Sequence, residues 1–441
     1  MIDLKVGQIG ATYLALSPLT LRAVSVTCAA PLRFDCMIPL SKPHAPTGAT
    51  SIHWRWLFAA PHRLFFFLGA SGLALVSAWW CLALLARQGW LPHTGAGAAS
   101  HPVLMAFGFM PFFVFGFAFT AGPRWLQIPA VAVSRVRTPA LLMAFSFAAM
   151  VLFDPVLPAF GYIAGFVWLA VLFARMLRSS RAPDKVHAHL VLACLSAGGL
   201  ALAAHAVSNL MGIDGRSTVR ALAIWGFLVP LFCVVCHRML PFFTASALSG
   251  YFHWRPWWLL GMLVGAAWLH GLLEWAGLGS LLWISDMPAA LLAGAVVWRW
   301  GLMQSLKNRL LAMLHLGFVW LAIAYALGAA RSMLLQAGID ALGQAPVHAI
   351  TIGFLCSLML AMVTRVTLGH SGRTLAADAF TWTIFVAFQG VAILRVAAEV
   401  LPAAYTSLIL LAAALWCTCL VTWAIRNSRI YLAPRADGQA G

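Results

Sequence analysis

Runs of apolar residues, each long enough to cross a lipid bilayer, alternate along most of the chain with short polar stretches. About 20 residues are needed for each crossing, and on this basis the runs predict twelve helices. Their expected ranges are 64–86, 102–122, 138–156, 158–177, 186–208, 218–236, 257–276, 280–301, 311–330, 346–368, 379–398 and 403–425. The shortest connections are Asp154-Pro155 and Gly277-Leu278-Gly279, and a helix continuing through one of them would reduce the total to eleven. The pattern predicts an all-α integral membrane protein.

Composition supports the bilayer. Of the 441 residues, 63% are hydrophobic and 9% are charged, against roughly 45–50% apolar and about 25% charged in soluble domains. The net charge of +17 does not indicate nucleic-acid binding, because Lys and Arg are scattered singly between the apolar runs. The nine Cys have no regular spacing and predict no disulfide framework. No P-loop, G-x-S-x-G or H-E-x-x-H motif supports an ATPase or hydrolase.

The basic residues predict an orientation. When the loops are assigned alternately to the two sides, nineteen Lys and Arg fall on one side and five on the other. The richer side faces the cytoplasm under the positive-inside rule, so both termini are expected there. Residues 1–56 are expected to form a flexible cytoplasmic extension, unless the reading frame is over-extended and Met37 is the start. Residues 57–430 would then form the membrane domain and 431–441 a cytoplasmic tail.

A period of about four helices runs along the chain. Three His residues open the first, fifth and ninth spans at spacings of 127 and 126 residues, namely His62, His189 and His315. Gly-Phe pairs recur in the second, sixth and tenth spans, at Gly108-Phe109, Gly226-Phe227 and Gly353-Phe354. The pattern predicts three repeats of four helices. Chance recurrence of Leu, Ala and Gly strings is the alternative.

The fourteen His residues are the main candidates for chemistry, because an ionisable group inside a membrane needs a partner or a ligand. Neutral imidazole binds both haem iron and copper. Sorted by span, the His residues form two layers, one near each face. The outer layer contains His101, His205, His270 and His348. The cytoplasmic layer contains His62, His187, His189, His237, His315 and His370.

His101 and His348 form the best pair, since they begin the second and tenth spans at the outer face. Two helices that each offer one imidazole across a gap can hold a six-coordinate haem. His205 and His270 are a second outer group, for copper or another haem. For each of these residues, a hydrogen bond to the backbone or a contact with lipid headgroups is the alternative.

Two further features need an interpretation. Cys233-Val234-Val235-Cys236-His237 matches the c-type haem motif, but it lies in the expected last turn of an apolar span at the cytoplasmic face. The two Cys are therefore expected to be buried small hydrophobes. Asp286 lies inside the eighth span, where it would relay protons, bind a nearby Arg, or form a helix turn before Pro288.

Four segments carry a resemblance to a known family. The segment that begins at His348 ends in Thr364-Arg365-Val366-Thr367-Leu368-Gly369-His370-Ser371-Gly372-Arg373. Arg238–Thr244 has the pattern R-x-x-P-x-F-T of a loop, and Leu314–Phe318 reads L-H-L-G followed by an aromatic residue. His101–Phe109 is similar to a segment of the form H-A-H-E-M-x-F-G-F. Together they resemble the NnrS family, polytopic bacterial membrane proteins that carry haem and copper and are associated with nitric oxide metabolism and nitrosative stress.

The resemblance implies an inner-membrane protein that binds haem b, with copper as a second cofactor, and acts in the nitric oxide response or in detoxification. The matching His positions are His101, His315, His348 and His370, with His205 as a looser match. Arg238 and Arg365, with Arg373, would anchor haem propionates or lipid headgroups at the cytoplasmic end. Val103 and Leu104 replace a second His and a Glu, so this member is expected to bind fewer metals or to belong to a divergent branch.

The helix count and the His pair on the second and tenth spans also resemble the catalytic subunits of haem-copper oxidases and nitric oxide reductases. Terminal-oxidase chemistry is not expected, because the sequence has no His-His dipeptide. The alternative functions are a polytopic secondary transporter, with broken helices and polar midplane residues, and a haem or metal transfer and assembly factor. If the protein is an enzyme, it would be a nitric oxide-related oxidoreductase. The expected partners are the bilayer and nitric oxide or another small gas, which reaches the haem through the lipid.

Overall fold

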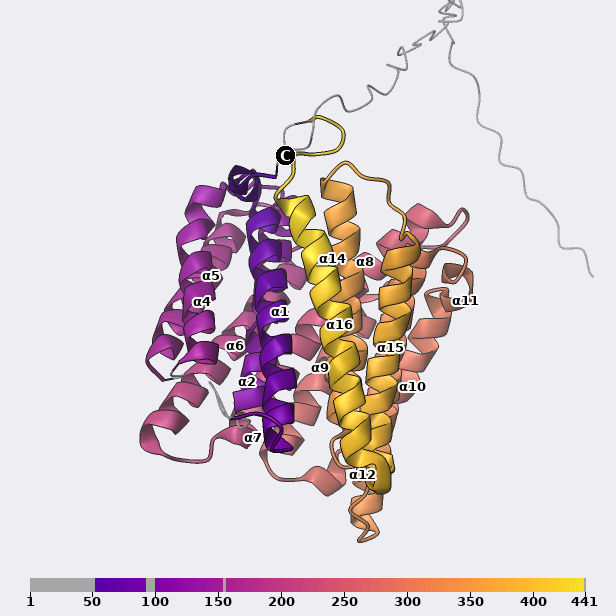
Figure 1. Cartoon of the computed structure of the whole chain (residues 1–441). Helices are drawn as coiled ribbons and strands as arrows, with labels where there is room; N and C mark the ends of the chain where they lie inside the picture. The colour runs from indigo at the N-terminus through magenta and orange to yellow at the C-terminus, as the bar shows by residue number, and fades with distance from the viewer. Residues whose placement is uncertain (1–51, 93–99, 154–155, 440–441) are drawn as a thin grey trace, which may run out of the picture. The chain divides into compact units, whose positions relative to one another are not determined.

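The computed structural model describes residues 52–92, 100–153 and 156–439, and every regular element in this part of the chain is a helix. Twelve helices there are long and apolar enough to cross a membrane (Figure 1). The α-helices in chain order are α1 (Pro61–Arg87), α2 (His101–Phe107), α3 (Met110–Trp125), α4 (Val133–Leu152), α5 (Val156–Ser179), α6 (Val186–Met211), α7 (Arg216–Arg220), α8 (Val229–Ala247), α9 (Trp257–Trp275), α10 (Trp283–Arg299), α11 (Leu302–Ser305), α12 (Arg309–Gln336), α13 (Ala345–His348), α14 (Ser357–His370), α15 (Ala379–Val400) and α16 (Tyr405–Tyr431).

The prediction of an all-α fold with twelve spans is confirmed. The second span combines α2 and α3. The sixth combines α7, the π-helical segment η3 (Ala221–Leu228) and α8, and the tenth combines α13, the π-helical segment η5 (Ala349–Cys356) and α14. The expected extension lies almost entirely in residues 1–51, outside the described residues, as does the Asp154-Pro155 turn.

The sixth span is longer than its apolar pattern predicts. Arg238 and Pro241 indicate an end near residue 236, yet α8 continues to Ala247. Leu240 and Thr244 are buried there, and packing outweighs the local cost of a proline inside a helix, about 3 kcal/mol. Two expectations are therefore wrong: the Cys233–His237 motif is not in the last turn, and the R-x-x-P-x-F-T segment is helix and not loop.

The second, sixth and tenth spans form the centre of the bundle. In their most apolar windows, 78–83% of the residues are buried, against 28–67% in the other nine spans. The three spans contact one another through α2 and η3, α3 and α14, and α8 and η5. A side chain on Gly72 of α1 would bring its Cβ within 2.4 Å of the Gly108 carbonyl oxygen, so this glycine lets the first span lie directly against the second.

These three central spans are also the irregular ones. The second is interrupted at Gly108-Phe109, and the π-helical segments of the sixth and tenth contain the other two Gly-Phe pairs. π-Helical insertions in long helices are frequent at functional sites. The threefold repeat itself stays a prediction, as does the similarity to oxidase subunits.

The first and last spans pack side by side (Figure 1). Arg63 of α1, with 2% of its surface exposed, donates from Nη1 to the carbonyl oxygens of Tyr431 at 3.3 Å and Ala433 at 2.8 Å. The start of the first span and the end of the last therefore lie at the same end of the bundle, as an even number of crossings requires. That this end faces the cytoplasm stays a prediction.

Asp378 caps α15 and ties it to α16. Its Oδ1 accepts from the backbone N–H of Thr381 at 3.0 Å, and its Oδ2 accepts from Arg426 Nη2 at 2.5 Å. Burial alone would raise the pKa of Asp378, but the hydrogen bonds from Arg426 and Thr381 outweigh burial and lower the pKa to about 2. Because the unfolded value is about 3.9, this stabilisation is complete above that pH and is lost as the pH falls toward 2.

We expect Asp378→Ala to lower the free energy of unfolding by about 1 kcal/mol at pH 7, the usual value of a helix cap. The deficit should shrink as the pH falls below about 3.9, because the carboxyl of Asp378 is then protonated in the unfolded state and the wild type loses part of the stabilisation by Arg426 and Thr381. Denaturant unfolding of both proteins in detergent at pH 7 and pH 3 measures this. A deficit that does not change with pH would contradict the assignment.

Candidate functional site

A cavity of about 1060 Å³ lies at the end of the bundle away from Arg63 and Tyr431. Its walls come from α1, α2, α6, α7, η3, α13, η5, α15 and α16, so residues distant in sequence surround one space. Cofactor pockets typically measure about 300–1,000 Å³. Three of the predicted outer-layer residues line the cavity: His101, His205 and His348.

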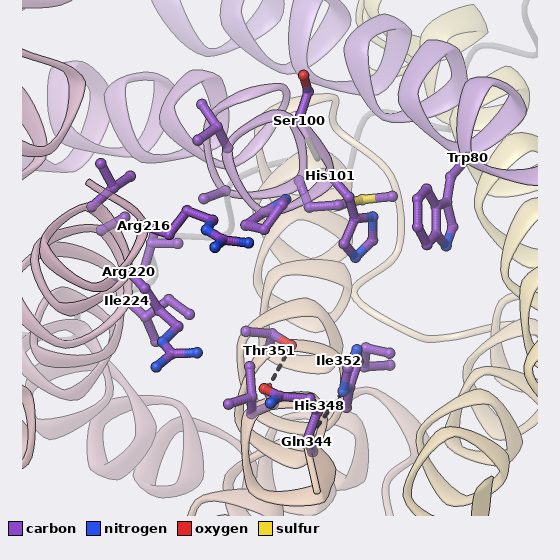
Figure 2. A pocket seen from close by; sticks show the side chains of 18 of the residues that line it. Trp80, Ser100, His101, Arg216, Arg220, Ile224, Gln344, His348, Thr351 and Ile352 are labelled. Atoms are coloured by element: carbon purple, nitrogen blue, oxygen red, sulfur yellow. Dashed lines mark hydrogen bonds between the residues drawn. The ribbon is translucent and has the colours of Figure 1, made fainter. Parts of the chain in front are cut away.

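The irregular helices shape two walls of this cavity. Ile224 lies in the π-helical segment of the sixth span, and Thr351 and Ile352 lie in that of the tenth (Figure 2). A π-helical turn changes the direction in which side chains project relative to a regular α-helix. The irregular segments of the central spans thus lie where the bundle leaves this space.

His101 is held in place by packing. It begins α2, where Pro102 fits the first turn. Its imidazole stacks on Trp80 of α1, with ring centroids 3.7 Å apart and an angle of 29° between the planes. Its Nδ1 is buried and has no hydrogen-bond partner among the described residues. Figure 2 shows the ring of His101 pointing into the space that it shares with His348.

His348 is oriented by a hydrogen bond. Its Nδ1 is 2.9 Å from the carbonyl oxygen of Gln344, four residues earlier (Figure 2). A carbonyl oxygen can only accept, so Nδ1 carries the proton and Nε2 keeps its lone pair. This is the arrangement in which an imidazole binds a metal through Nε2, with the other nitrogen held by a backbone carbonyl.

His205 lines the same cavity but already has a partner. Its Nε2 accepts a hydrogen bond from Asn209 Nδ2 at 3.1 Å. Val103, which stands where the family segment has a second His, also lines the cavity. Within the described ranges, no three His, Cys, Asp or Glu side chains converge to hold a metal ion.

His270 does not line the cavity and pairs with Asp286. Its Nδ1 is 2.7 Å from Asp286 Oδ1, which also accepts from Ser285 Oγ at 2.8 Å, and its ring packs on Trp225 with centroids 3.6 Å apart. Asp286 therefore binds a histidine rather than the Arg considered from the sequence. His205 and His270, expected as one group, have different neighbours.

His315 and His370 lie at the opposite end of the bundle. His315 Nε2 is 3.0 Å from Thr244 Oγ1 of α8. The ring of His370 lies beside that of His62 of α1, with centroids 4.7 Å apart. Neither residue lines the large cavity.

Arg365 and Arg238 are also remote from the large cavity. The guanidinium of Arg365 lies 4.1 Å from the centre of the Phe243 ring, and Nη2 donates to Ser246 Oγ at 3.3 Å. The guanidinium of Arg238 lies 4.8 Å from the centre of the Trp125 ring. Any group that these two residues anchor is therefore different from a group bound in the cavity by His101 and His348.

Four arginines on the cavity wall were missed as site residues: Arg87, Arg216, Arg220 and Arg395. The sequence did single them out, because they are four of the five basic residues on the side of the membrane that has fewer Lys and Arg. Three of them form ion pairs at 2.6–2.7 Å: Arg216 with Asp214, which also lines the cavity, Arg220 with Glu274 and Arg395 with Glu399. This side of the bundle thus concentrates its few positive charges at one cavity.

Comparison with known proteins identifies a family. The model of the family described as NnrS protein matches residues 56–435, which include all twelve spans. No curated protein matches the chain. Membership of this family supports a membrane protein linked to the nitric oxide response. The fold, the cavity and the match over nearly the whole chain lead to one conclusion: the chain belongs to the NnrS family.

Proposed function

We propose that this protein binds a haem b in the large cavity, where His101 and His348 would hold it, and that it acts there in the cell's handling of nitric oxide. The observation that carries the proposal is that two imidazoles from different central spans share one cavity, each with a nitrogen free of hydrogen bonds. From the predicted orientation, the site lies near the periplasmic face of the inner membrane.

The residues present fit a haem in three respects. The cavity, at about 1060 Å³, is large enough for a cofactor of this size. Its walls are mainly apolar, as the porphyrin faces require, with Ile224 and Ile352 among them. Arginines on the wall can pair with propionate carboxylates, and Arg87 has no acidic partner among the described residues.

The chain's own residues would do three things for such a group. The Gln344 carbonyl keeps His348 in one tautomer, and stacking on Trp80 fixes the plane of His101. The apolar walls exclude water, and nitric oxide, being small and apolar, can arrive through the lipid. When bound, the haem would supply an iron centre for a diatomic gas, and one of the two imidazoles would have to leave the iron to make room for the gas.

Copper is also part of the proposal, in a weaker form. The family implies it, and His205 is the imidazole on the cavity wall that is not assigned to haem. Val103, 7% exposed, and Leu104, 2% exposed, contribute no ligand where the family segment has His and Glu. A copper ion here would therefore need Asn209 to release His205 Nε2.

A secondary transporter is the second candidate function. It is favoured by the irregular helices of the second, sixth and tenth spans around a cavity, since discontinuous helices frame transporter binding sites. A haem or metal transfer factor would use the same ligands as a haem protein and hold the cofactor only transiently.

An optical spectrum of the detergent-purified protein tests the proposal. We expect one b-type haem per chain in the oxidised and dithionite-reduced forms, with a shift of the Soret band when nitric oxide is added to the reduced protein. A correctly folded protein without haem would overturn the assignment and leave the transporter. Rapid loss of haem to apomyoglobin would favour the transfer factor, and metal analysis of the same sample tests copper.

A further inference from the structure

A second group of basic side chains gathers at the other end of the bundle, where α1 begins and α14 and α16 end (Figure 1). His62 and Arg63 open α1, and His370 closes α14 with its ring 4.7 Å from that of His62. Arg373 follows α14, and the last described residues fold back over this end through a hydrogen bond from the Ala436 N–H to the Ser371 carbonyl. None of these residues lines the large cavity.

Several buried polar atoms in this cluster lack hydrogen-bond partners among the described residues. His62 is 5% exposed and Arg63 is 2% exposed. His62 Nδ1, Arg63 Nη2 and Arg373 Nη1 are buried, and none of them has a hydrogen-bond partner among the described residues. A buried polar atom without a partner costs about 1–3 kcal/mol, and more when its group is charged. Three such atoms in one cluster indicate that an acceptor belongs there.

Positive charge in the cluster exceeds negative charge. The charged groups that act on Arg63 are Arg373 and Arg435, and both are positive. Arg124 adds a further positive charge near His370. Asp437 is the acid beside them, and both of its oxygens are already bound to Arg435, at 2.9 and 2.5 Å. Arg63 and Arg373 are therefore not neutralised by any side chain in the described part of the chain.

Neither backbone carbonyl oxygens nor water can satisfy and neutralise these groups. Arg63 Nη1 donates to backbone carbonyl oxygens of Tyr431 and Ala433, which stabilises that nitrogen but leaves the other without an acceptor. Water could accept hydrogen bonds from the free donors, but it would not neutralise two guanidinium groups close together. An anion with several acceptor oxygens meets both needs, because each oxygen can bind a guanidinium through charge-assisted hydrogen bonds.

We propose that this cluster binds a phosphate group, with Arg373 and Arg63 contacting its oxygens and His62 donating a further hydrogen bond. The group is the headgroup of an anionic phospholipid or a free phosphate compound from the aqueous side. The site is separate from the proposed haem cavity and does not depend on it.

The test uses the full-length protein in phosphatidylcholine nanodiscs, with the thermal unfolding midpoint measured in two titrations. In one, phosphatidylglycerol replaces part of the lipid; in the other, inorganic phosphate is added in place of chloride at constant ionic strength. We expect a rise in the midpoint in at least one titration. A rise with phosphatidylglycerol alone identifies a lipid headgroup, and a rise with phosphate identifies a free anion.

Arg373→Gln is the informative variant, because Arg63 also joins α1 to the end of α16 and its loss would unsettle the fold. The apparent affinity for the effective anion should fall at least about tenfold. Arg178→Gln is the matched control, an exposed arginine at the same end of the bundle on α5, and it should behave as wild type.

Either of two results would overturn the proposal: no rise in either titration, or an equal loss of affinity in Arg373→Gln and Arg178→Gln. The optical spectrum is recorded on the same samples. An unchanged haem band in Arg373→Gln would show that the outcome at this site is independent of the proposed haem function.

Discussion

Substitution of either histidine proposed to hold the haem, His101→Ala or His348→Ala, is expected to remove nearly all of the haem from the purified protein. Loss of an outer-shell partner of a ligand already costs about 10–100-fold in metal affinity, and loss of the ligand itself should cost at least as much. The haem-to-protein ratio should therefore fall from about one to below about one tenth. The measurement is a pyridine haemochrome assay, normalised to protein and combined with size-exclusion chromatography to confirm folding.

Two control variants make this result specific. His189→Ala removes an exposed imidazole of α6 that bonds only to the Lys185 carbonyl, and it should leave the haem band unchanged. His205→Ala removes the third imidazole of the cavity, and it should keep the haem while lowering any copper content. A full haem band in both folded axial-ligand variants would exclude this pair as ligands.

Asp286→Ala is expected to be the most destabilising single substitution among the polar residues of the bundle. Asp286 has 0% exposure and His270 has 5%, so neither side chain can turn to solvent when its partner is lost. Removing one member of a buried, hydrogen-bonded pair typically costs about 3–5 kcal/mol. Unfolding in a mixed-micelle denaturant series should show a loss of this size.

A double-mutant cycle with His270→Phe separates the interaction energy of the two side chains from the cost of removing each one. The combined variant should lose clearly less stability than the sum of the two single variants, because the second change removes a partner that is already unpaired. Ser285→Ala, which removes the other hydrogen bond to Asp286 Oδ1, should cost only about 1 kcal/mol. Additive losses would mean that the two side chains do not depend on each other.

The spans were predictable because the bilayer demands about 20 apolar residues for each crossing, and that pattern does not depend on which helices are neighbours. Their ends and their irregular segments were not. Pro241 is a stop signal locally, and only the burial of Leu240 and Thr244 against other spans explains why α8 continues. The π-helical segments contain ordinary apolar residues and leave no mark in a hydropathy pattern.

The candidate site was predictable where two residues occupy equivalent places in their spans. His101 and His348 both begin a span on the outer side, and the structure brings both to one cavity. The depth of a residue in the membrane is predictable, but the rotation of its helix about the helix axis is not. His205 faces the cavity and His270 does not, and the sequence did not distinguish them. The stacking of Trp80 on His101 depends on a contact between two spans, which the sequence does not show.

The pairing of His270 with Asp286 could have been found. The two residues lie eight positions before and eight after Leu278, at the tight connection between α9 and the next span. Antiparallel helices joined by a short turn place such positions at the same depth. The arginines of the cavity could also have been found, since basic residues are unusual on the outer side of a membrane protein and indicate a local role.

The contact between the first and last spans determines when the site can be completed during synthesis. Trp80 of α1 lies on one side of the cavity, and Tyr405 and Trp416 of α16 also line it. The ribosome makes α16 after the other walls of the cavity, so the nascent chain presents an open-sided cavity until α16 has entered the membrane beside α1. A ligand of this cavity would therefore be enclosed only at the end of membrane insertion, and a chain that stops before α16 would expose the apolar faces of α1 and α15 to lipid and leave the cavity without a wall.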